Sequence, residues 1–223
     1  MTVFKVHADG QVTSLRLGDE VPYENRPIGF CYPVFPVTLE PGINPFYLHF
    51  SNKGTFVVSL HLWDVAEFQT YAKYDDVILG FLYGCLVVLL LYNTFLMVSI
   101  RCKTYGLYVL YLLVFIASQF RIQATGIEWI GGDFGHWLMN RGWLPLVSLS
   151  HFFSCLFAIR FLNMSAYMPR WKRVLEVLAI INIGVAIHGL FGPYHLIGKE
   201  LTYTTVLVSV ALIGAGCWSP IKR

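Results

Sequence analysis

The sequence predicts a mostly helical, polytopic membrane bundle of five spans, preceded by a partial, jelly-roll-like β-sandwich outside the membrane. The first observation is the stretch from Val77 to Ser99, which carries no charge and is long enough to cross the ~30 Å apolar layer of a bilayer as a helix. The second is composition: 56% of residues are hydrophobic and 13% are charged, against ~25% charged in soluble domains. The third is that residues 1–75 are rich in turns and alternate like strands.

Residues 1–75 are predicted to form the extracellular or periplasmic domain. Phe46–Ser51 alternates between apolar and polar residues, and Thr55–Trp63 does so again after a turn at Asn52-Lys53-Gly54. This pattern is typical of a half-buried antiparallel pair of strands. Its core face would hold Phe46, Leu48, Phe50, Phe56, Val58, Leu60 and Leu62. A full sandwich needs about seven or eight strands, so this one is predicted to be incomplete.

The other face of this strand pair would present aromatic and imidazole groups together. Its candidate ligand-binding residues are Tyr47, His49, His61 and Trp63. Such a face can hold a sugar ring or another small polar ligand. The alternative is a face that is solvated or covered by a second sheet.

Residues 76–223 are predicted to form the transmembrane bundle, with spans at about 77–99, 105–120, 144–161, 174–191 and 201–218. Basic residues follow the first, third and fifth spans, at Arg101, Lys103, Arg160, Arg170, Lys172, Arg173, Lys222 and Arg223. The opposite loops mix few basic residues with acidic ones. Because Lys and Arg concentrate on the cytoplasmic side, the N-terminus is predicted outside and the C-terminus in the cytoplasm.

Few polar side chains interrupt the spans, and four of them fall in the outer leaflet of this topology: Gln119, Arg121, His151 and His188. Imidazole and charged groups in a bilayer are costly and usually face other helices or a water-filled cavity. One hypothesis is therefore an outward-facing polar vestibule that senses a ligand or a proton. The other is four unrelated residues, each hydrogen-bonded or reaching toward the membrane surface.

Two further contacts between spans are predicted. Arg160 and Glu176 lie at similar depth near the inner ends of successive spans, where they could form a structural ion pair. Gly80 and Gly84 have the GxxxG spacing that permits close helix packing, within this chain rather than in a dimer. Asn93 projects from the opposite side of the same span.

The residues that catalysis or metal binding requires are scarce in the spans. Glu176 is their one carboxylate, and two histidines are too few for zinc, which takes three or four protein ligands. We therefore expect no enzyme, no metal and no cofactor. The net charge of +3 follows from the basic loops and indicates no nucleic-acid partner. A transporter or channel is the alternative function, although the internal repeats typical of transporters are not evident.

Several short motifs, in order, resemble bacterial seven-transmembrane receptors with diverse intracellular signalling modules (7TMR-DISM). They are Arg26-Pro27-Ile28, the run from Val34 to Gly42, Leu60-His61-Leu62-Trp63, the run from Leu79 to Gly84, Leu91-Tyr92-Asn93 and the run from Leu107 to Tyr111. The resemblance implies a sensory receptor module of the bacterial inner membrane. An extracellular sandwich would bind a carbohydrate-like or other small ligand, and helices would pass the signal to a cytoplasmic output domain or partner.

The resemblance also implies a receptor truncated at both ends. The first half of the sensor domain is missing by comparison with the family pattern, and the chain ends after five spans rather than seven. No secretory signal is evident at Met1–Gly10. Either the first span directs export of the N-terminus or a piece lies upstream, and we favour the second.

Overall fold

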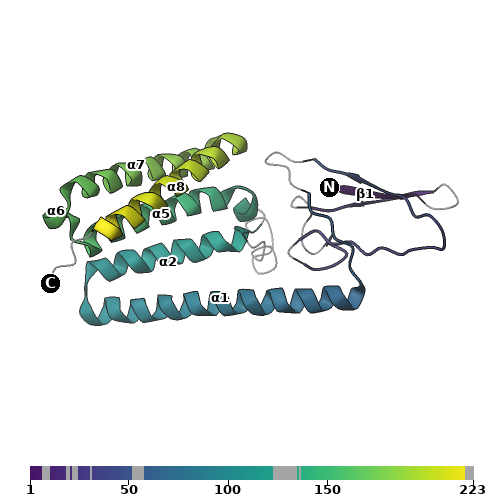
Figure 1. The fold of residues 1–223 in the computed structure, drawn as a ribbon, viewed down its shortest axis with the longest axis horizontal. Helices are drawn as coiled ribbons and strands as arrows, with labels where there is room; N and C mark the ends of the chain where they lie inside the picture. Colours follow the sequence, from purple (N-terminus) through teal and green to yellow (C-terminus); the bar gives the residue numbers. More distant parts are fainter. Residues whose placement is uncertain are drawn as a thin grey trace. The chain divides into compact units, whose positions relative to one another are not determined.

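The computed structural model describes residues 1–6, 11–18, 21, 25–30, 32–51, 58–122, 135 and 137–218 (Figure 1). The chain divides into two compact units. One contains residues 1–62 and 120–140, and the other contains residues 63–119 and 141–223.

The first unit contains a three-stranded antiparallel sheet of order β2-β1-β3. Its strands are β1 (Thr2–Val6), β2 (Val12–Arg16) and β3 (Phe46–His49). Val3 of β1 lies opposite Leu15 on one side and Leu48 on the other, and its side chain is 4% exposed. Leu17 and Phe30 are also buried.

The predicted pairing of β3 with the segment that follows it is wrong over residues 58–63. Those residues form neither strand nor helix, and β3 pairs with β1 instead. Val58, Leu60 and Leu62 are consequently exposed rather than on a core face, whereas Phe46, Leu48 and Phe50 are half-buried. Phe56 and the turn at 52–54 lie outside the described residues. Local alternation of apolar and polar residues indicates a strand, but it does not reveal which distant strand pairs with it.

The second unit begins with one long helix, α1 (Val65–Ile100). The Asp64 carboxylate caps it by accepting a hydrogen bond from the Ala66 amide at 2.9 Å, and it ends at Arg101, whose φ of 52° is left-handed. At 36 residues, α1 is about 54 Å long, well beyond the ~30 Å apolar layer. The first predicted span is therefore the inner part of a helix that also extends outside the membrane.

The remaining predicted spans each fall within a helix, confirming their helical character. These helices are α2 (Lys103–Ile122), α5 (Trp143–Phe161), α7 (Pro169–Phe191) and α8 (Tyr194–Trp218). A π-helical turn η2 (Leu138–Gly142) precedes α5, and a short helix α6 (Met164–Tyr167) precedes α7. In the described part of the chain, four segments are long and apolar enough to cross a membrane: 65–100, 140–161, 169–191 and 196–218.

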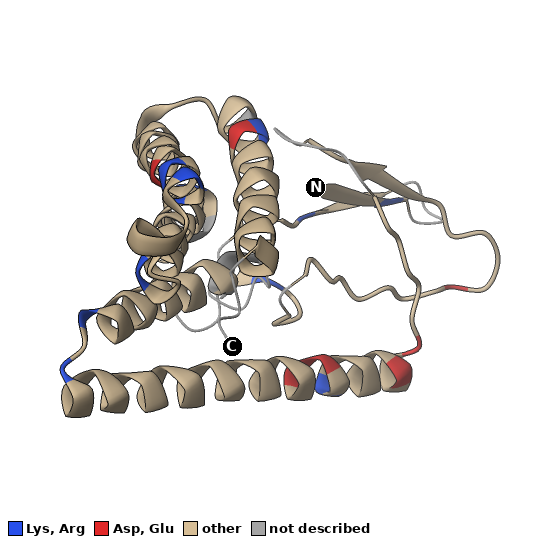
Figure 2. Ribbon diagram, turned by 60° about the vertical axis from the view of Figure 1, so that its left-hand side comes forward, with Lys and Arg blue, Asp and Glu red and all other residues tan. Residues whose placement is uncertain are grey.

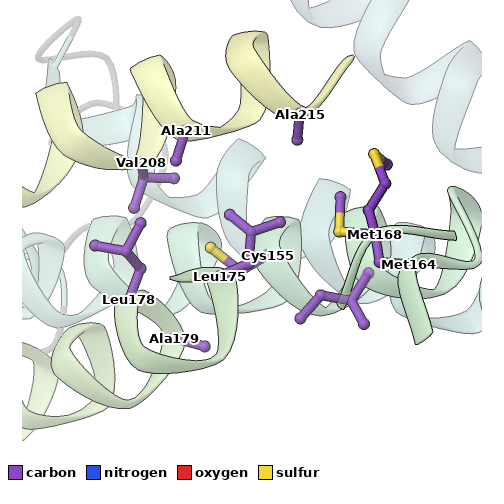
Figure 3. Packing of buried hydrophobic residues seen from close by; sticks show 10 residues of the cluster. Cys155, Met164, Met168, Leu175, Leu178, Ala179, Val208, Ala211 and Ala215 are labelled. Atoms are coloured by element: carbon purple, nitrogen blue, oxygen red, sulfur yellow. The ribbon is translucent and has the colours of Figure 1, made fainter. Parts of the chain in front are cut away.

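Helices α5, α7 and α8 pack together around a buried cluster. The cluster contains Cys155, Ile159, Met164, Met168, Leu175, Leu178, Ala179, Val208, Ala211 and Ala215 (Figure 3). Lipid tails are as apolar as these side chains, so helices associate in membranes through close packing and small residues. Gly214 illustrates this, because a Cβ there would lie 2.8 Å from the Trp171 ring of α7.

By contrast, α1 is little covered by the rest of the described chain. Only 6% of its most apolar window is buried, and its one buried residue is Asn93. Met97 of α1 lies against Gly106 of α2, near the turn that joins them. Figure 2 shows charged residues along the first part of α1 and in the turn that follows its other end, with none between them, as expected of a helix surrounded by lipid.

Candidate functional site

A layer of buried polar residues separates two apolar clusters in the α5–α7–α8 bundle. Ser148 of α5, Asn182 of α7 and Thr204 of α8 are 0%, 0% and 6% exposed. Toward one end of the bundle lies the smaller cluster of Leu144, Ile197 and Leu201. Toward the other end lies the larger cluster drawn in Figure 3. We call Ser148, Asn182, Thr204 and the neighbouring His151 the polar layer.

The polar groups of this layer are bonded mostly within their own helices. Ser148 Oγ donates to the Leu144 carbonyl at 3.3 Å, and Thr204 Oγ1 donates to the Leu201 carbonyl at 3.1 Å. Asn182 Nδ2 donates to the Leu178 carbonyl at 2.8 Å. Hydroxyl and amide donors are thereby satisfied without holding one helix to another.

Two atoms of the layer are different. Nδ1 of His151 and Oδ1 of Asn182 are buried and have no hydrogen-bond partner within standard geometry among the described residues. The two side chains nevertheless interact across the α5–α7 interface. A buried polar group without a partner costs about 1–3 kcal/mol. We therefore take His151 and Asn182 as the candidate functional pair of the bundle.

A second polar contact ties α7 to α8 near the turn that joins them. His188 Nδ1 lies 2.8 Å from Glu200 Oε2, with both side chains partly exposed. The His188 ring packs directly over the Cα of Gly192, where any Cβ would collide with it. Nearby, Arg141 Nη1 reaches the Leu190 carbonyl at 3.5 Å, so groups from η2, α7 and α8 meet here.

This packing makes Gly192 a sensitive position. We expect Gly192→Ala to displace the His188 ring and lower the free energy of unfolding by about 1–3 kcal/mol, as overpacking does. Gly198→Ala is the matched control, because a Cβ there has nothing within 4 Å and alanine favours the helix by up to ~1 kcal/mol. Thermal unfolding of both variants in detergent measures the difference. Equal effects would contradict the packing described.

The structure places two of the four predicted vestibule residues in one bundle and gives them separate partners. His151 lies beside Asn182, and His188 lies beside Glu200. Gln119 is half-buried near the end of α2. Arg121 lies in the last turn of α2, but its side chain is outside the described part of the chain. A shared vestibule stays a prediction.

The four predicted residues of the outer domain do not share one sheet face. Tyr47 and His49 project from the exposed face of β3, and Tyr47 is 62% exposed. His61 lies in the segment that forms no strand. Trp63 belongs to the helical unit, where it stacks on Tyr71 with ring centroids 5.2 Å apart.

Trp63 also borders an open depression on the first turns of α1. Its other lining residues are Ala66, Glu67 and Thr70. An aromatic face beside a carboxylate and a hydroxyl offers both stacking and hydrogen bonding to a small polar ligand.

The predicted ion pair between Arg160 and Glu176 does not form. Glu176 pairs with Lys172 one turn earlier on α7, with Nζ and Oε1 3.5 Å apart. Arg160 is exposed and acts electrostatically on Cys102, in the turn between α1 and α2. Lys172 lies four residues from Glu176 on the same helix, so this ion pair forms whatever the rotation of α7 against its neighbours.

In the described part of the chain, no helix lies against the predicted glycine seam. Gly80 and Gly84 have no atom of another segment within 4 Å of an added Cβ among the described residues. The opposite side of α1 does face protein, since Asn93 is 8% exposed and its Nδ2 donates to the Leu89 carbonyl at 2.8 Å. The expected packing of the glycines within this chain is therefore corrected.

Cys102 lies in the short turn between α1 and α2. Hydrogen bonds from the backbone and side chain of Thr104 lower the pKa of Cys102 below its usual value, with a smaller contribution from Arg160. A lower pKa means more thiolate at pH 7 and faster alkylation.

We expect Thr104→Val to raise the pKa of Cys102 and slow its alkylation by iodoacetamide several-fold at neutral pH. Thr104→Ser keeps the hydroxyl and is the matched control. The rate is measured on full-length protein with the other cysteines replaced by alanine. An unchanged rate in Thr104→Val would show that the hydroxyl does not stabilise the thiolate.

The sequence reasoning missed Asn182, Ser148 and Glu200. Asn182 carried a usable signal, because it falls at helical spacing among the apolar residues Leu175 and Leu178. Asparagine on an apolar stripe of a membrane helix faces protein rather than lipid. Glu200 gave no such signal, because its contact with His188 depends on how the turn between α7 and α8 folds.

Two family models match successive parts of the chain. Residues 75–223 match the family model described as 7TM diverse intracellular signalling. Residues 1–64 match the model described as 7TMR-DISM extracellular 2. Neither a curated protein nor a solved structure gives a significant match. The chain therefore belongs to the 7TMR-DISM family, as a multi-pass membrane protein with an extracellular N-terminal domain.

Proposed function

We propose that this chain is the sensing and transmembrane part of a signalling receptor. A small ligand binds outside the membrane, and the packing of the helices changes so that a cytoplasmic output domain or partner responds. The observation that carries this proposal is α1, which runs without interruption from Val65 outside the membrane to Ile100 at the opposite end of the span.

An uninterrupted helix transmits displacement because its backbone hydrogen bonds resist bending. The first turns of α1 carry Glu67, Lys73, Asp75 and Asp76 and stay in water, while the uncharged remainder lies in lipid. A ligand that favours one position of these turns moves the inner end of α1 as well. The energy for this comes from the difference in ligand affinity between the two helix arrangements.

The proposed topology has five spans in a bacterial inner membrane. Helix α2 is the additional span: its 20 residues extend about 30 Å, enough to cross the apolar layer. An odd number of spans puts the C-terminus in the cytoplasm when the N-terminus is outside. The cytoplasmic side then carries Arg101 and Lys103 at the turn between α1 and α2, and Arg160, Arg170, Lys172 and Arg173 at the adjoining ends of α5 and α7, in agreement with the positive-inside rule.

The proposed ligand is a small polar molecule, with carbohydrate-like compounds as the first class to test. The depression beside Trp63 and Glu67 supports this because it combines an aromatic face with hydrogen-bonding groups on α1 itself. The proposal assigns the chain no catalytic step. A transporter remains the alternative, and solute flux into liposomes would favour it.

The test uses the full chain in lipid nanodiscs with an environment-sensitive fluorophore on Cys102, the other cysteines being replaced by alanine. Glucose, galactose, maltose, succinate and single amino acids are titrated in turn. We expect at least one compound to bind, as measured by calorimetry, and to change the fluorescence saturably at the same concentration. A compound that binds outside the membrane without changing the fluorescence would contradict the signalling role.

A further inference from the structure

The two unpartnered atoms of the polar layer are complementary. A protonated Nδ1 of His151 can donate a hydrogen bond, and Oδ1 of Asn182 can only accept one. Both are buried, and Asn182 lies between Leu178 and Val185, which are themselves buried. Leaving both atoms unpaired is unfavourable, whereas a hydrogen bond between them would satisfy both.

The amide orientation of Asn182 is fixed by its other contact. Its Nδ2 donates to the Leu178 carbonyl at 2.8 Å. A flipped amide would bring two carbonyl oxygens together, which is repulsive. The atom presented to His151 is therefore the oxygen, and the atom presented by His151 has to carry a proton.

From this arrangement we infer that His151 Nδ1–H donates to Asn182 Oδ1 across the α5–α7 interface, and that His151 Nε2 is thereby a proton-binding site inside the membrane bundle. In a neutral imidazole the partner of one nitrogen decides which nitrogen carries the proton. With the proton held on Nδ1, the lone pair lies on Nε2. A second proton binds there, and the resulting imidazolium strengthens the Nδ1–H···Oδ1 bond because its donor is now charged.

The surroundings of the site bear on its proton uptake. Helices α5, α7 and α8 pack on one another, and α2 packs on α5 through the rings of Tyr108 and Phe157, whose centroids are 4.9 Å apart. Along α7, the titratable residues Glu176 and His188 each lie six residues from Asn182, and along α8 Glu200 lies four residues from Thr204. Both carboxylates already have partners, since Glu176 pairs with Lys172 and Glu200 with His188. The Asn182 amide is thus the proposed direct partner of the imidazolium.

The inference is tested by nuclear magnetic resonance on the full chain in lipid nanodiscs. Ser150–His151 is the one Ser–His pair in the sequence, so carbonyl-labelled serine with 13C,15N-labelled histidine identifies His151 without mutation. The 15N shifts of its ring show which nitrogen carries the proton. We expect Nδ1 to be protonated at high pH and Nε2 to gain a second proton as the pH is lowered. A proton on Nε2 at high pH, or a ring that stays neutral to pH 4, would overturn the inference.

A pair of variants tests whether Asn182 sets the tautomer. Asn182→Leu removes the acceptor and is expected to shift the neutral ring toward a mixture of the two tautomers. Asn93→Leu is the matched control, because Asn93 is also buried and makes the same bond to its own helix. An Asn182→Leu spectrum identical to that of the wild type would exclude the hydrogen bond. This test does not depend on the signalling role, since it measures a ring and not a response.

Discussion

Replacing Leu175 by alanine is expected to lower the free energy of unfolding of the membrane bundle by about 2–4 kcal/mol. Leu175 of α7 is 0% exposed and belongs to the cluster between α5, α7 and α8 (Figure 3). In a membrane the loss comes from packing, because the removed atoms leave a cavity that the helices fill only partly. Unfolding in mixed micelles of increasing sodium dodecyl sulfate, followed by circular dichroism, measures it.

Val177→Ala is the control for this prediction. Val177 lies on the same helix two residues later and is 56% exposed, so it faces lipid in the proposed topology. Its truncation replaces protein–lipid contacts with other protein–lipid contacts, and we expect a change within about 0.5 kcal/mol. If the two variants were equally destabilised, α7 would not present Leu175 to the bundle and Val177 to lipid.

Breaking α1 outside the membrane is expected to uncouple ligand binding from the inner end of the helix. Asp76→Pro removes a backbone donor and introduces a clash with the preceding turn, which together cost about 3 kcal/mol and kink or break a helix. Asp76 is exposed and does not line the depression beside Trp63. We expect the ligand-dependent fluorescence change at Cys102 to fall about ten-fold while calorimetry still detects binding.

Asp76→Ala serves as the comparison for the helix break. It removes the same carboxylate but keeps the backbone bond and favours the helix, so the fluorescence response should be retained. If Asp76→Pro bound ligand and still gave the full response, the signal would not travel through the outer turns of α1.

The local sequence pattern was sufficient to predict the helices but not the pairing of the strands in the sheet. A membrane helix satisfies its own backbone hydrogen bonds, so a long apolar stretch such as Val77–Ser99 needs no partner to be recognised. A strand needs a neighbour that can come from anywhere in the chain. The alternation at Phe46–Ser51 correctly indicated a strand, but β3 pairs with β1 near the N-terminus, and residues 58–63 form no strand.

In the candidate site, likewise, some residues could be predicted from the sequence but their partners could not. His151 and His188 were predicted as functional from their chemical type and depth alone, because an imidazole in an apolar span is costly wherever it points. Their partners Asn182 and Glu200 were not predicted. Lys172 likewise replaced Arg160 as the partner of Glu176, because side-chain partners depend on the rotation of each helix about its axis.

The sequence by itself determined that this chain is a polytopic membrane protein, where its helices lie and that it resembles the 7TMR-DISM family. Those properties follow from the length, hydropathy and order of contiguous segments. Only the tertiary structure decided that α5, α7 and α8 form the packed bundle while α1 is largely uncovered by the rest of the described chain. It also brought His151 beside Asn182. Lipid and protein interiors are equally apolar, so hydropathy alone does not distinguish a lipid-facing side of a helix from a buried one.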